Sequence, residues 1–400
     1  MCAPAHPRKT NGEEPTMKRL VSAVLACALT VGLFAGCGQA PSSPSTPASA
    51  GSQPVAAPTP EPTPPPYTAE VLTGEKREDG TVPNTRITAI MVNNIAACRP
   101  QRGLSDAKVL FEIRVEGGIS RFMALYDDYK TIPTVGPVRS GRDQFFRLIL
   151  PYQALFVHVG ESSVQEEFIE NYDYGDYNLD GKYVDNVVWR DQSRLNQGYS
   201  LEHTAYTSGE KISALVTSRG IDMNRTYNSP VFNFVNYDEP ARTLTGGEAN
   251  EVTVYHSQTY RTRLTYDSAS GKYLMSQYAG GSFTPTVDEN NNVQLNFDNV
   301  LVLFTDIHTY PGHESTDLQY AEYNYGGVGY YYNGGRYEKI RWRKNNDMSV
   351  LEFLDGDGNE IPVQLNTGTT YVAVAPLSEA EKFEAPDEVQ QAADSAAQAG

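Results

Sequence analysis

Arginine side chains are concentrated between residues 99 and 194, in a chain whose formal net charge is -17. Among them are Arg99, Arg102, Arg114, Arg121, Arg139, Arg142, Arg190 and Arg194. Arg139 and Arg142 lie in the sequence GPVRSGRD (136–143), where a strand pattern is followed by a helical one and Ser140 can cap the helix. Free N–H groups at a helix start, with guanidinium groups beside them, suit a carboxylate or phosphate. This segment therefore predicts an anion site.

The same arginines have an alternative explanation, because acidic residues accompany them in the sequence. Glu112, Glu116 and Asp143 could pair with the arginines in a buried network that only stabilises the fold. The sequence leaves both interpretations open. The further candidates for contact with a ligand are Arg121, Arg190, Asp191 and Arg194.

Glu112 and Glu116 also suggest an acid and base pair, since residues of equal parity on a strand project from one face. Four strand residues separate their Cα atoms by about 13 Å, whereas the paired carboxylates of glycosidases lie about 5 to 9.5 Å apart. A catalytic pair of these two residues is therefore excluded. Either one would need a partner from elsewhere, such as Asp143, Glu161 or Asp191. We assign no catalytic residue.

Two histidines, His158 and His203, are further candidates. His158 lies near the end of the apolar segment 154–160, and ligands of open α/β sheets collect at the carboxyl ends of strands. A buried histidine that bonds to a backbone carbonyl is the more common situation. Neither histidine has the paired spacing of a metal motif such as HExxH. We therefore expect no metal and no cofactor.

Strands and helices must position these residues. Up to about residue 220 strand patterns alternate with helical ones, and after it strand patterns separated by turns prevail. In the first half the strand patterns cover residues 86–94, 109–115, 121–126 and 154–160, and the helical ones 140–150 and 162–172. Capping boxes at Ser162 and Thr207 mark two helix starts.

These patterns predict an α+β fold. We expect an N-terminal α/β domain with a mixed sheet at residues 69–225 and a C-terminal mainly-β domain at residues 226–377. Residues 378–400 are rich in Glu and Ala without an apolar period, and we predict a disordered acidic tail.

The beginning of the chain is predicted to be a targeting segment. A basic pair and an apolar run follow Met17, and the run ends at Cys37. We interpret residues 1–36 as a signal peptide with its true start at Met17, and Cys37 as the residue that carries lipid. Ordinary cleavage and release of a secreted protein is the alternative. Residues 37–68 are rich in Pro, Ser, Thr and Ala, as expected of an extended linker.

The net charge indicates which classes of partner are unsuitable, and the cysteine content indicates whether disulfide bonds can form. An acidic surface argues against nucleic acid. After processing, Cys98 would be the remaining free thiol beside the lipidated Cys37, so no intrachain disulfide is expected. The predicted location is the outer face of the cytoplasmic membrane, with the lipid on Cys37 as the anchor.

Several motifs resemble those of the YerB-type lipoprotein family. They are NN at 93–94, RPQ at 99–101, EGGISRF at 116–122, GPVRS at 136–140 and FVH at 156–158, with GVG at 327–329 and Trp342 in the second half. The resemblance covers about residues 70 to 376. It implies a membrane-anchored protein outside the cytoplasm, most typical of Gram-positive bacteria, and supplies neither an activity nor catalytic residues. Ile95 and Gly141 depart from the family, whose members usually have His and Ala there.

Two functions fit these observations. The first is a non-enzymatic envelope lipoprotein that binds an anionic cell-wall fragment or acidic peptide end at Arg139 and Arg142, with a second domain that faces a cell-wall or envelope protein partner. The alternative is an enzyme acting on cell-wall glycan or lipid-linked phosphate. There the arginines would hold the anion while Glu112, Glu116 or His158 moves protons.

Overall fold

The computed structural model describes residues 67–382. The predicted signal peptide, Cys37, nearly all of the linker and the tail from residue 383 onward lie outside these residues. A short 3-10 helix, Leu377–Lys382, includes the first five residues of the predicted tail.

The central strand β1 (Thr88–Asn93) shows why the sequence forms a sheet that is covered on both sides. All of its residues are buried. They alternate between the two faces: Ala89 and Met91 contact one hydrophobic core, while Ile90 and Val92 contact the other. A nearly continuous apolar strand of this kind is typical of a sheet with two covered faces.

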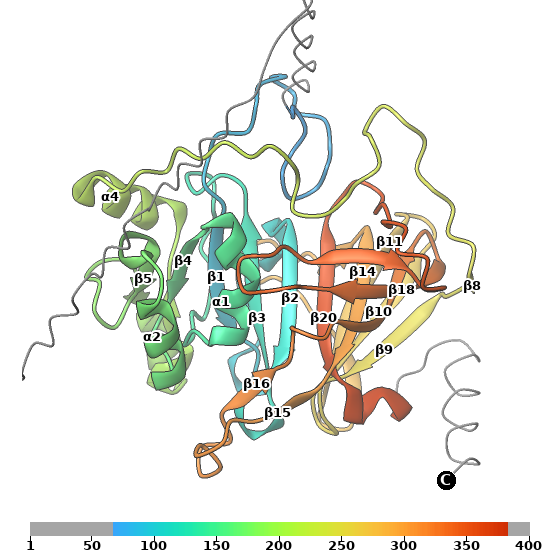
Figure 1. Ribbon diagram of the computed structural model, residues 1–400. Helices are drawn as coiled ribbons and strands as arrows, with labels where there is room; N and C mark the ends of the chain where they lie inside the picture. The colour runs from blue at the N-terminus through green and yellow to red at the C-terminus, as the bar shows by residue number, and fades with distance from the viewer. Residues whose placement is uncertain (1–66, 383–400) are drawn as a thin grey trace, which may run out of the picture. The chain divides into compact units, whose positions relative to one another are not determined.

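The main sheet is mixed and runs through both halves of the chain (Figure 1). Besides β1 its strands are β2 (Val109–Arg114), β3 (Ser120–Tyr126), β4 (Leu155–His158), β5 (Asn178–Asp180), β8 (Gly247–Glu248), β14 (Asn299–Thr305), β17 (Gly327–Asn333), β18 (Arg336–Arg343), β19 (Glu352–Asp355) and β20 (Thr370–Pro376). Their order is β19-β18-β17-β14-β20-β2-β3-β1-β4-β5, and β8 pairs with β18. Because β20 pairs with β2 in parallel, the last strand of the chain joins the sheet of the first half.

A second sheet packs against the main one. It contains β9 (Glu251–Tyr255), β10 (Arg261–Asp267), β11 (Lys272–Ala279), β12 (Ser282–Pro285) and β13 (Asn296–Phe297). The order is β12-β11-β10-β9, with β13 beside β11. Its inward side chains, among them Val252, Leu264 and Tyr273, share a core with Ile90 and Val92. Residues in β11 alternate between buried and partly exposed positions, as expected of a sheet with one covered face.

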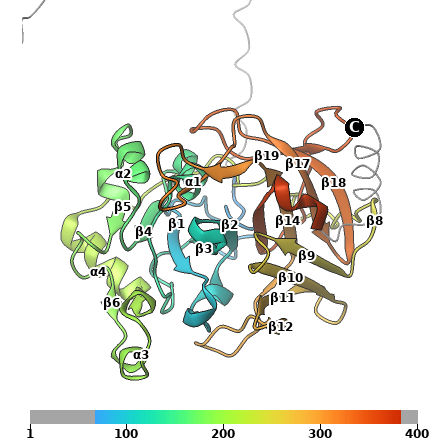
Figure 2. The same cartoon turned by 90° about the horizontal axis from the view of Figure 1, so that it is seen from below.

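Helices cover the sheet at its β4 and β5 end, whereas the second sheet lies at the other end (Figures 1 and 2). They are α1 (Asp143–Ile149), α2 (Ser163–Glu170), α3 (Gln192–Asn196) and α4 (Gly209–Arg219). Phe145 and Phe146 of α1 pack with Met91, while Ile212 of α4 packs with Ile90 on the opposite face. Short strand pairs complete the fold: β6 (Trp189–Arg190) with β7 (Ala205–Tyr206), and β15 (Ile307–Thr309) with β16 (Gln319–Ala321).

The predicted α+β class is confirmed, with a mixed sheet and a strand-rich C-terminal region. The main sheet nevertheless continues across both halves. The predicted domain boundary near residue 225 falls in the segment 220–246, which contains no helix or strand, and its position stays a prediction. Within residues 67–382 no helix has the length and apolar character needed to cross a membrane.

Two predicted helix starts are wrong and one is confirmed. Helix α1 begins at Asp143 after an extended Arg142, so Ser140 does not cap it. The carbonyl oxygen of Ser140 instead accepts a hydrogen bond from Arg121. Ser162 caps α2 as predicted, but α4 is capped by Ser208. The hydroxyl of the predicted cap residue Thr207 donates to the carbonyl of Val187.

Candidate functional site

Glu112, in the middle of β2, is a fully buried carboxylate that joins the two halves of the chain. Four side chains donate hydrogen bonds to it: Asn94 (3.0 Å), Ser120 (2.5 Å), Thr262 (2.8 Å) and Tyr371 (2.6 Å). Nε2 of His256 lies 3.5 Å from its Oε2 atom. Two of the donors come from the first half of the chain and two from the second. Glu112 therefore holds the main sheet and the second sheet together.

The environment of Glu112 favours its ionised form. Burial alone would raise its pKa, but the nearby charge of His256 and the hydrogen bonds from Ser120 and Tyr371 lower the pKa to about 2. A carboxylate that remains ionised and accepts this many bonds is not available as a proton donor near neutral pH. Its role in the fold is to stabilise the junction between the sheets.

Asn94 extends this network from Glu112 toward two glutamines. Its amide nitrogen donates to Glu112 and Ser120, and its Oδ1 atom accepts from Nε2 of Gln101 (3.1 Å) and of Gln277 (2.8 Å). Gln101 Nε2 also donates to the backbone carbonyl of Asn93. These acceptors fix the orientation of both glutamine amides, because only the nitrogen side can face them. Each glutamine oxygen is left buried and without a hydrogen-bond partner among residues 67–382.

A cavity of about 230 Å³ lies beside these glutamines. It is formed by the loop after β1 together with β11, β12 and the residues that follow β12. Its lining residues are Arg99, Pro100, Gln101, Gln277, Thr284, Pro285, Thr286 and Val287. Four of them carry buried polar atoms that have no partner in the described part of the protein: Nε and Nη1 of Arg99, Oε1 of Gln101, Oε1 of Gln277 and Oγ1 of Thr286. Buried polar atoms usually have a hydrogen-bond partner in folded proteins, so a ligand or water in the cavity can complete the bonding of these side chains.

Arg99 is the charged group of this cavity. Its Nη2 atom donates to the carbonyl of Asn94 (3.0 Å), and it forms no ion pair with a carboxylate of residues 67–382. Burial lowers the pKa of Arg99, while the charge of Glu112 opposes this effect from a distance. A guanidinium group in this setting lacks the counter-ion that buried charges normally have.

Arg139 and Arg142, the predicted anion-binding pair, contact carboxylates of the protein itself. Nη2 of Arg139 lies 2.6 Å from Oε2 of Glu202, and Nε of Arg142 pairs with Glu116. Burial alone would raise the pKa of Glu116, but the charges of Arg142 and Arg121 lower it. The alternative of an internal network is the one that this geometry favours. A role of the two arginines in ligand binding stays a prediction.

Arg121 lies next to this pair and is almost completely buried. It donates to the carbonyl of Ser140 (2.6 Å), and its Nη2 atom lies 3.7 Å from Glu116. Burial and then the charge of Arg142 place its pKa well below the ordinary value. The structure thus gathers Arg121, Ser140, Arg142 and Glu116 in one cluster. Glu112 does not belong to this cluster. It is part of the separate hydrogen-bond network described above.

Asp143 occupies the first turn of the seven-residue helix α1. Its Oδ2 atom accepts hydrogen bonds from the hydroxyl of Tyr310 (2.6 Å) and from Arg147 (3.2 Å). Burial raises the pKa of Asp143. The start of the helix is thus occupied by an acidic side chain of the protein, which links α1 to the segment that follows β15.

His158 is a core histidine. It is fully buried, with Nδ1 at 2.9 Å from the carbonyl of Gly160 and Nε2 at 2.7 Å from Oδ1 of Asn178. Both ring nitrogens are therefore occupied. His203 is also buried: its Nδ1 atom lies 3.1 Å from the amide nitrogen of Asn93. Burial lowers the pKa of His203.

The other candidates have internal partners too. Arg190 donates to the carbonyl of Leu201 (2.7 Å), and Asp191 caps α3 and accepts from Arg102 (2.8 Å). Glu161 accepts from the amide of Gln165 (2.7 Å). No group of three or more His, Cys, Asp or Glu residues within 67–382 could hold a metal ion.

Arg194 has a positioning role near the cavity. Its guanidinium group donates to the carbonyls of Cys98 (2.8 Å) and Pro100 (2.5 Å), which flank Arg99, and to Glu289 (2.6 Å). Arg194 therefore fixes the backbone on both sides of Arg99.

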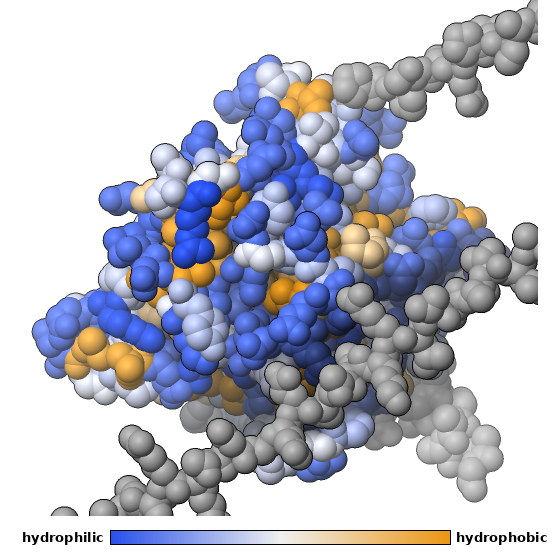
Figure 3. Space-filling view, turned by 60° about the vertical axis from the view of Figure 1, so that its left-hand side comes forward, coloured by the Kyte–Doolittle hydropathy of each residue, from blue (hydrophilic) through white to orange (hydrophobic). Residues whose placement is uncertain are grey.

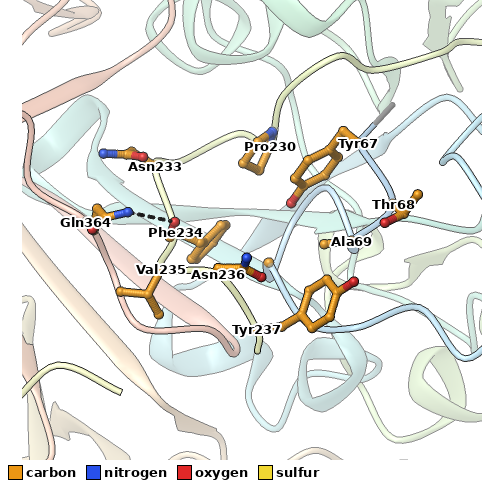
Figure 4. A pocket seen from close by; sticks show the side chains of 11 residues that line it. Tyr67, Thr68, Ala69, Pro230, Asn233, Phe234, Val235, Asn236, Tyr237 and Gln364 are labelled. Atoms are coloured by element: carbon orange, nitrogen blue, oxygen red, sulfur yellow. Dashed lines mark hydrogen bonds between the residues drawn. The ribbon is translucent and has the colours of Figure 1, made fainter. Parts of the chain in front are cut away.

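Three larger cavities differ from the cavity at Arg99. The first, of about 320 Å³, is acidic: Glu70, Asp127 and Asp128 line it, and its arginine, Arg77, pairs with Glu70. The other two lack a free charge. One, of about 390 Å³, is lined by the aromatic rings of Tyr67, Phe234 and Tyr237 and by no charged side chain (Figure 4). The other, of about 410 Å³, contains Arg343 and Glu352, which pair with each other at 2.5 Å. The face shown in Figure 3 is mostly hydrophilic, with hydrophobic residues in separate patches. Among these four cavities, the Arg99 cavity combines an arginine that has no ion pair with buried amide oxygens that have no partner in the described residues.

The sequence did not single out most of this site. Asn94, Arg99 and Gln101 lie in motifs of the family resemblance, but they had no assigned role. Gln277 and Thr286 belong to none of these motifs. Their signal is weak: an uncharged polar residue inside or just after an apolar strand pattern, here QY at 277–278 and TPT at 284–286.

Known proteins resemble this chain in sequence and in fold. A protein of Bacillus subtilis (strain 168) named "Putative lipoprotein YerB" is 28% identical over 309 residues, which cover 76% of this chain and 85% of that protein. The crystal structure of the YerB protein from Bacillus subtilis matches with a TM-score of 0.64 at 23% identity, and the match covers 77% of this chain and 97% of that one. The structural match supports the fold.

Models of one protein family match both halves of the chain. Residues 72–222 match the model described as "Protein of unknown function (DUF3048) N-terminal domain", and residues 251–372 match the corresponding C-terminal domain. Together the matched regions span more than half of the 400 residues. The chain therefore belongs to the DUF3048 family.

Proposed function

We propose that this protein is a lipoprotein anchored through Cys37 to the outer face of the cytoplasmic membrane, and that it binds a small anionic ligand of the cell envelope in the Arg99 cavity. The name of the Bacillus subtilis relative supports the lipoprotein part. So does the apolar run that ends at Cys37, ahead of a Pro-rich linker.

The observation that carries the binding role is the unpaired guanidinium group of Arg99. Arg121 and Arg194 each leave one buried nitrogen without a partner, but each also has a carboxylate nearby. Among the described residues Arg99 has the carbonyl of Asn94 and no carboxylate, and two of its nitrogens are buried at the cavity without a partner. Leaving a buried charge uncompensated costs several kcal/mol, so an anion in the cavity would be stabilised by neutralising it. Arg194 holds the flanking carbonyls and so preorganises the group.

The geometry supports binding better than catalysis. Among the groups proposed to move protons, Glu112 and His158 are fully buried with all their polar atoms engaged, and Glu116 pairs with two arginines. None of the three lines the Arg99 cavity.

Calorimetric titration of the whole chain with acetate, inorganic phosphate and D-glucuronate tests this proposal. At least one probe should bind, and Arg99→Gln should weaken its binding at least about 10-fold, as expected for the loss of a charge-assisted hydrogen bond. Arg261→Gln is the matched control. Arg261 lies on the second sheet and also has one carbonyl partner, Gln258, but it does not line the cavity. Equal binding by the Arg99→Gln variant, or no binding of any probe, would contradict the proposal.

A further inference from the structure

We propose that the ligand of the Arg99 cavity is a compact monoanionic acid that carries its own neutral hydrogen-bond donors, such as the amide N–H of an N-acylated amino acid or the hydroxyls of a sugar acid. This inference rests on the proposed function and specifies the ligand class.

The two unpaired glutamine oxygens require donors. Gln101 and Gln277 both direct their amide nitrogens to Oδ1 of Asn94, which fixes their orientation. Their Oε1 atoms are acceptors only, and both residues are at most 2% exposed. A simple carboxylate such as acetate has no donor to offer them. A ligand that also brings O–H or N–H groups satisfies Arg99 and the glutamines together.

The hydrogen-bond donors of the ligand should be uncharged groups. No carboxylate lines the cavity, so an ammonium group would meet the guanidinium charge of Arg99 without a counter-ion. Hydroxyl and amide groups avoid this repulsion. The hydroxyl of Thr286, which is 5% exposed and has no partner in the described chain, can accept from such a group or donate to the acid.

The size of the cavity selects a small molecule. Its volume of about 230 Å³ equals the liquid volume of roughly eight water molecules. A ligand that fills this space has on the order of ten non-hydrogen atoms. The apolar walls are Pro100, Pro285 and Val287. Pro285 ends the edge strand β12 and has no N–H, so this edge is poorly suited to pair with a long peptide strand. One acylated residue or one monosaccharide fits better.

A ligand series on the whole chain tests this inference by calorimetry. The probes are acetate, N-acetylglycine, D-glucuronate and the neutral methyl ester of D-glucuronic acid. At least one donor-bearing acid should bind about 10-fold or more tightly than acetate, since each neutral hydrogen bond contributes roughly a fivefold gain. The neutral ester should bind far more weakly than glucuronate. Which of the two acids binds more tightly distinguishes an amino-acid source from a sugar source.

Two variants complete the test. Gln277→Leu should reduce the preference for donor-bearing acids about fivefold and leave acetate binding unchanged. Thr286→Val should fold like the wild type, because the hydroxyl bonds to nothing in the described chain, and should weaken binding of the preferred acid about fivefold. If all acids bind alike and still depend on Arg99, the proposed function stands and this inference is wrong. Equal binding of the neutral ester contradicts it as well, and binding of no acid overturns both.

Discussion

Replacement of Glu112 by glutamine should destabilise the protein in a way that depends on pH. The pKa of Glu112 is lowered from the ordinary value of 4.5 to about 2 in the folded protein. At about 1.4 kcal/mol per pH unit, this difference corresponds to about 3 kcal/mol of folding free energy. Because the folded pKa is the lower one, this stabilisation is fully present above the unfolded pKa, at about pH 5.5 and higher. It is lost as the pH falls through the folded pKa, and about 1 kcal/mol remains at pH 3.

Urea unfolding of the wild type and of Glu112→Gln at pH 7 and pH 3 measures this effect. The free energy of unfolding should differ by about 3 kcal/mol at pH 7 and by about 2 kcal/mol less at pH 3. Titrating groups that do not interact with Glu112 are shared by the two proteins and cancel in the difference. The exposed Glu75 provides the matched variant, Glu75→Gln, which should change neither value by more than about 0.5 kcal/mol. A difference that is the same at both pH values would show that Glu112 is not ionised in the fold, and the reasoning would fail.

Two further predictions concern the fold around the site. Gly136→Ala should destabilise the protein by about 2 kcal/mol or more, because φ is +151° and a Cβ atom would lie 2.7 Å from the carbonyl oxygen of Ala205. Urea unfolding measures this loss. The control in the same titration is Gly175→Ala, since Gly175 has open space around it. Cys98 should react with a thiol reagent at least about 100-fold more slowly in the folded protein than in urea, because burial raises its pKa to about 12. Mass spectrometry of the Cys98 peptide measures this rate, and rapid labelling of the native chain would contradict the buried position.

Local patterns were sufficient to predict much of the fold. The nearly continuous apolar run of β1, the alternation in β11 and the cap at Ser162 depend on residues close together in the sequence, and these features are as expected. The start of α1 was wrong for a tertiary reason. Arg142 adopts an extended backbone beside Glu116, and the helix begins after it at Asp143.

The partners of the site residues could not be predicted, because they are distant in the sequence. Arg139 meets Glu202, which is 63 residues away, and Tyr371 donates to Glu112 across 259 residues. The cavity could not be predicted for the same reason. Arg99 and Gln101 come from one half of the chain, and Gln277 and Thr286 come from the other. No pattern within a single segment contains this arrangement.

The position of β20 has a consequence for how the protein folds. This strand lies between β14 and β2, yet it ends at Pro376 and is the last strand within residues 67–382. Until it has left the ribosome and, for an exported protein, crossed the membrane, β2 presents an unpaired apolar edge. Such edges pair readily with other chains, and contacts between distant residues form slowly. The first half must therefore wait for nearly the whole chain, and any delay in delivering residues 370–376 would favour aggregation over folding.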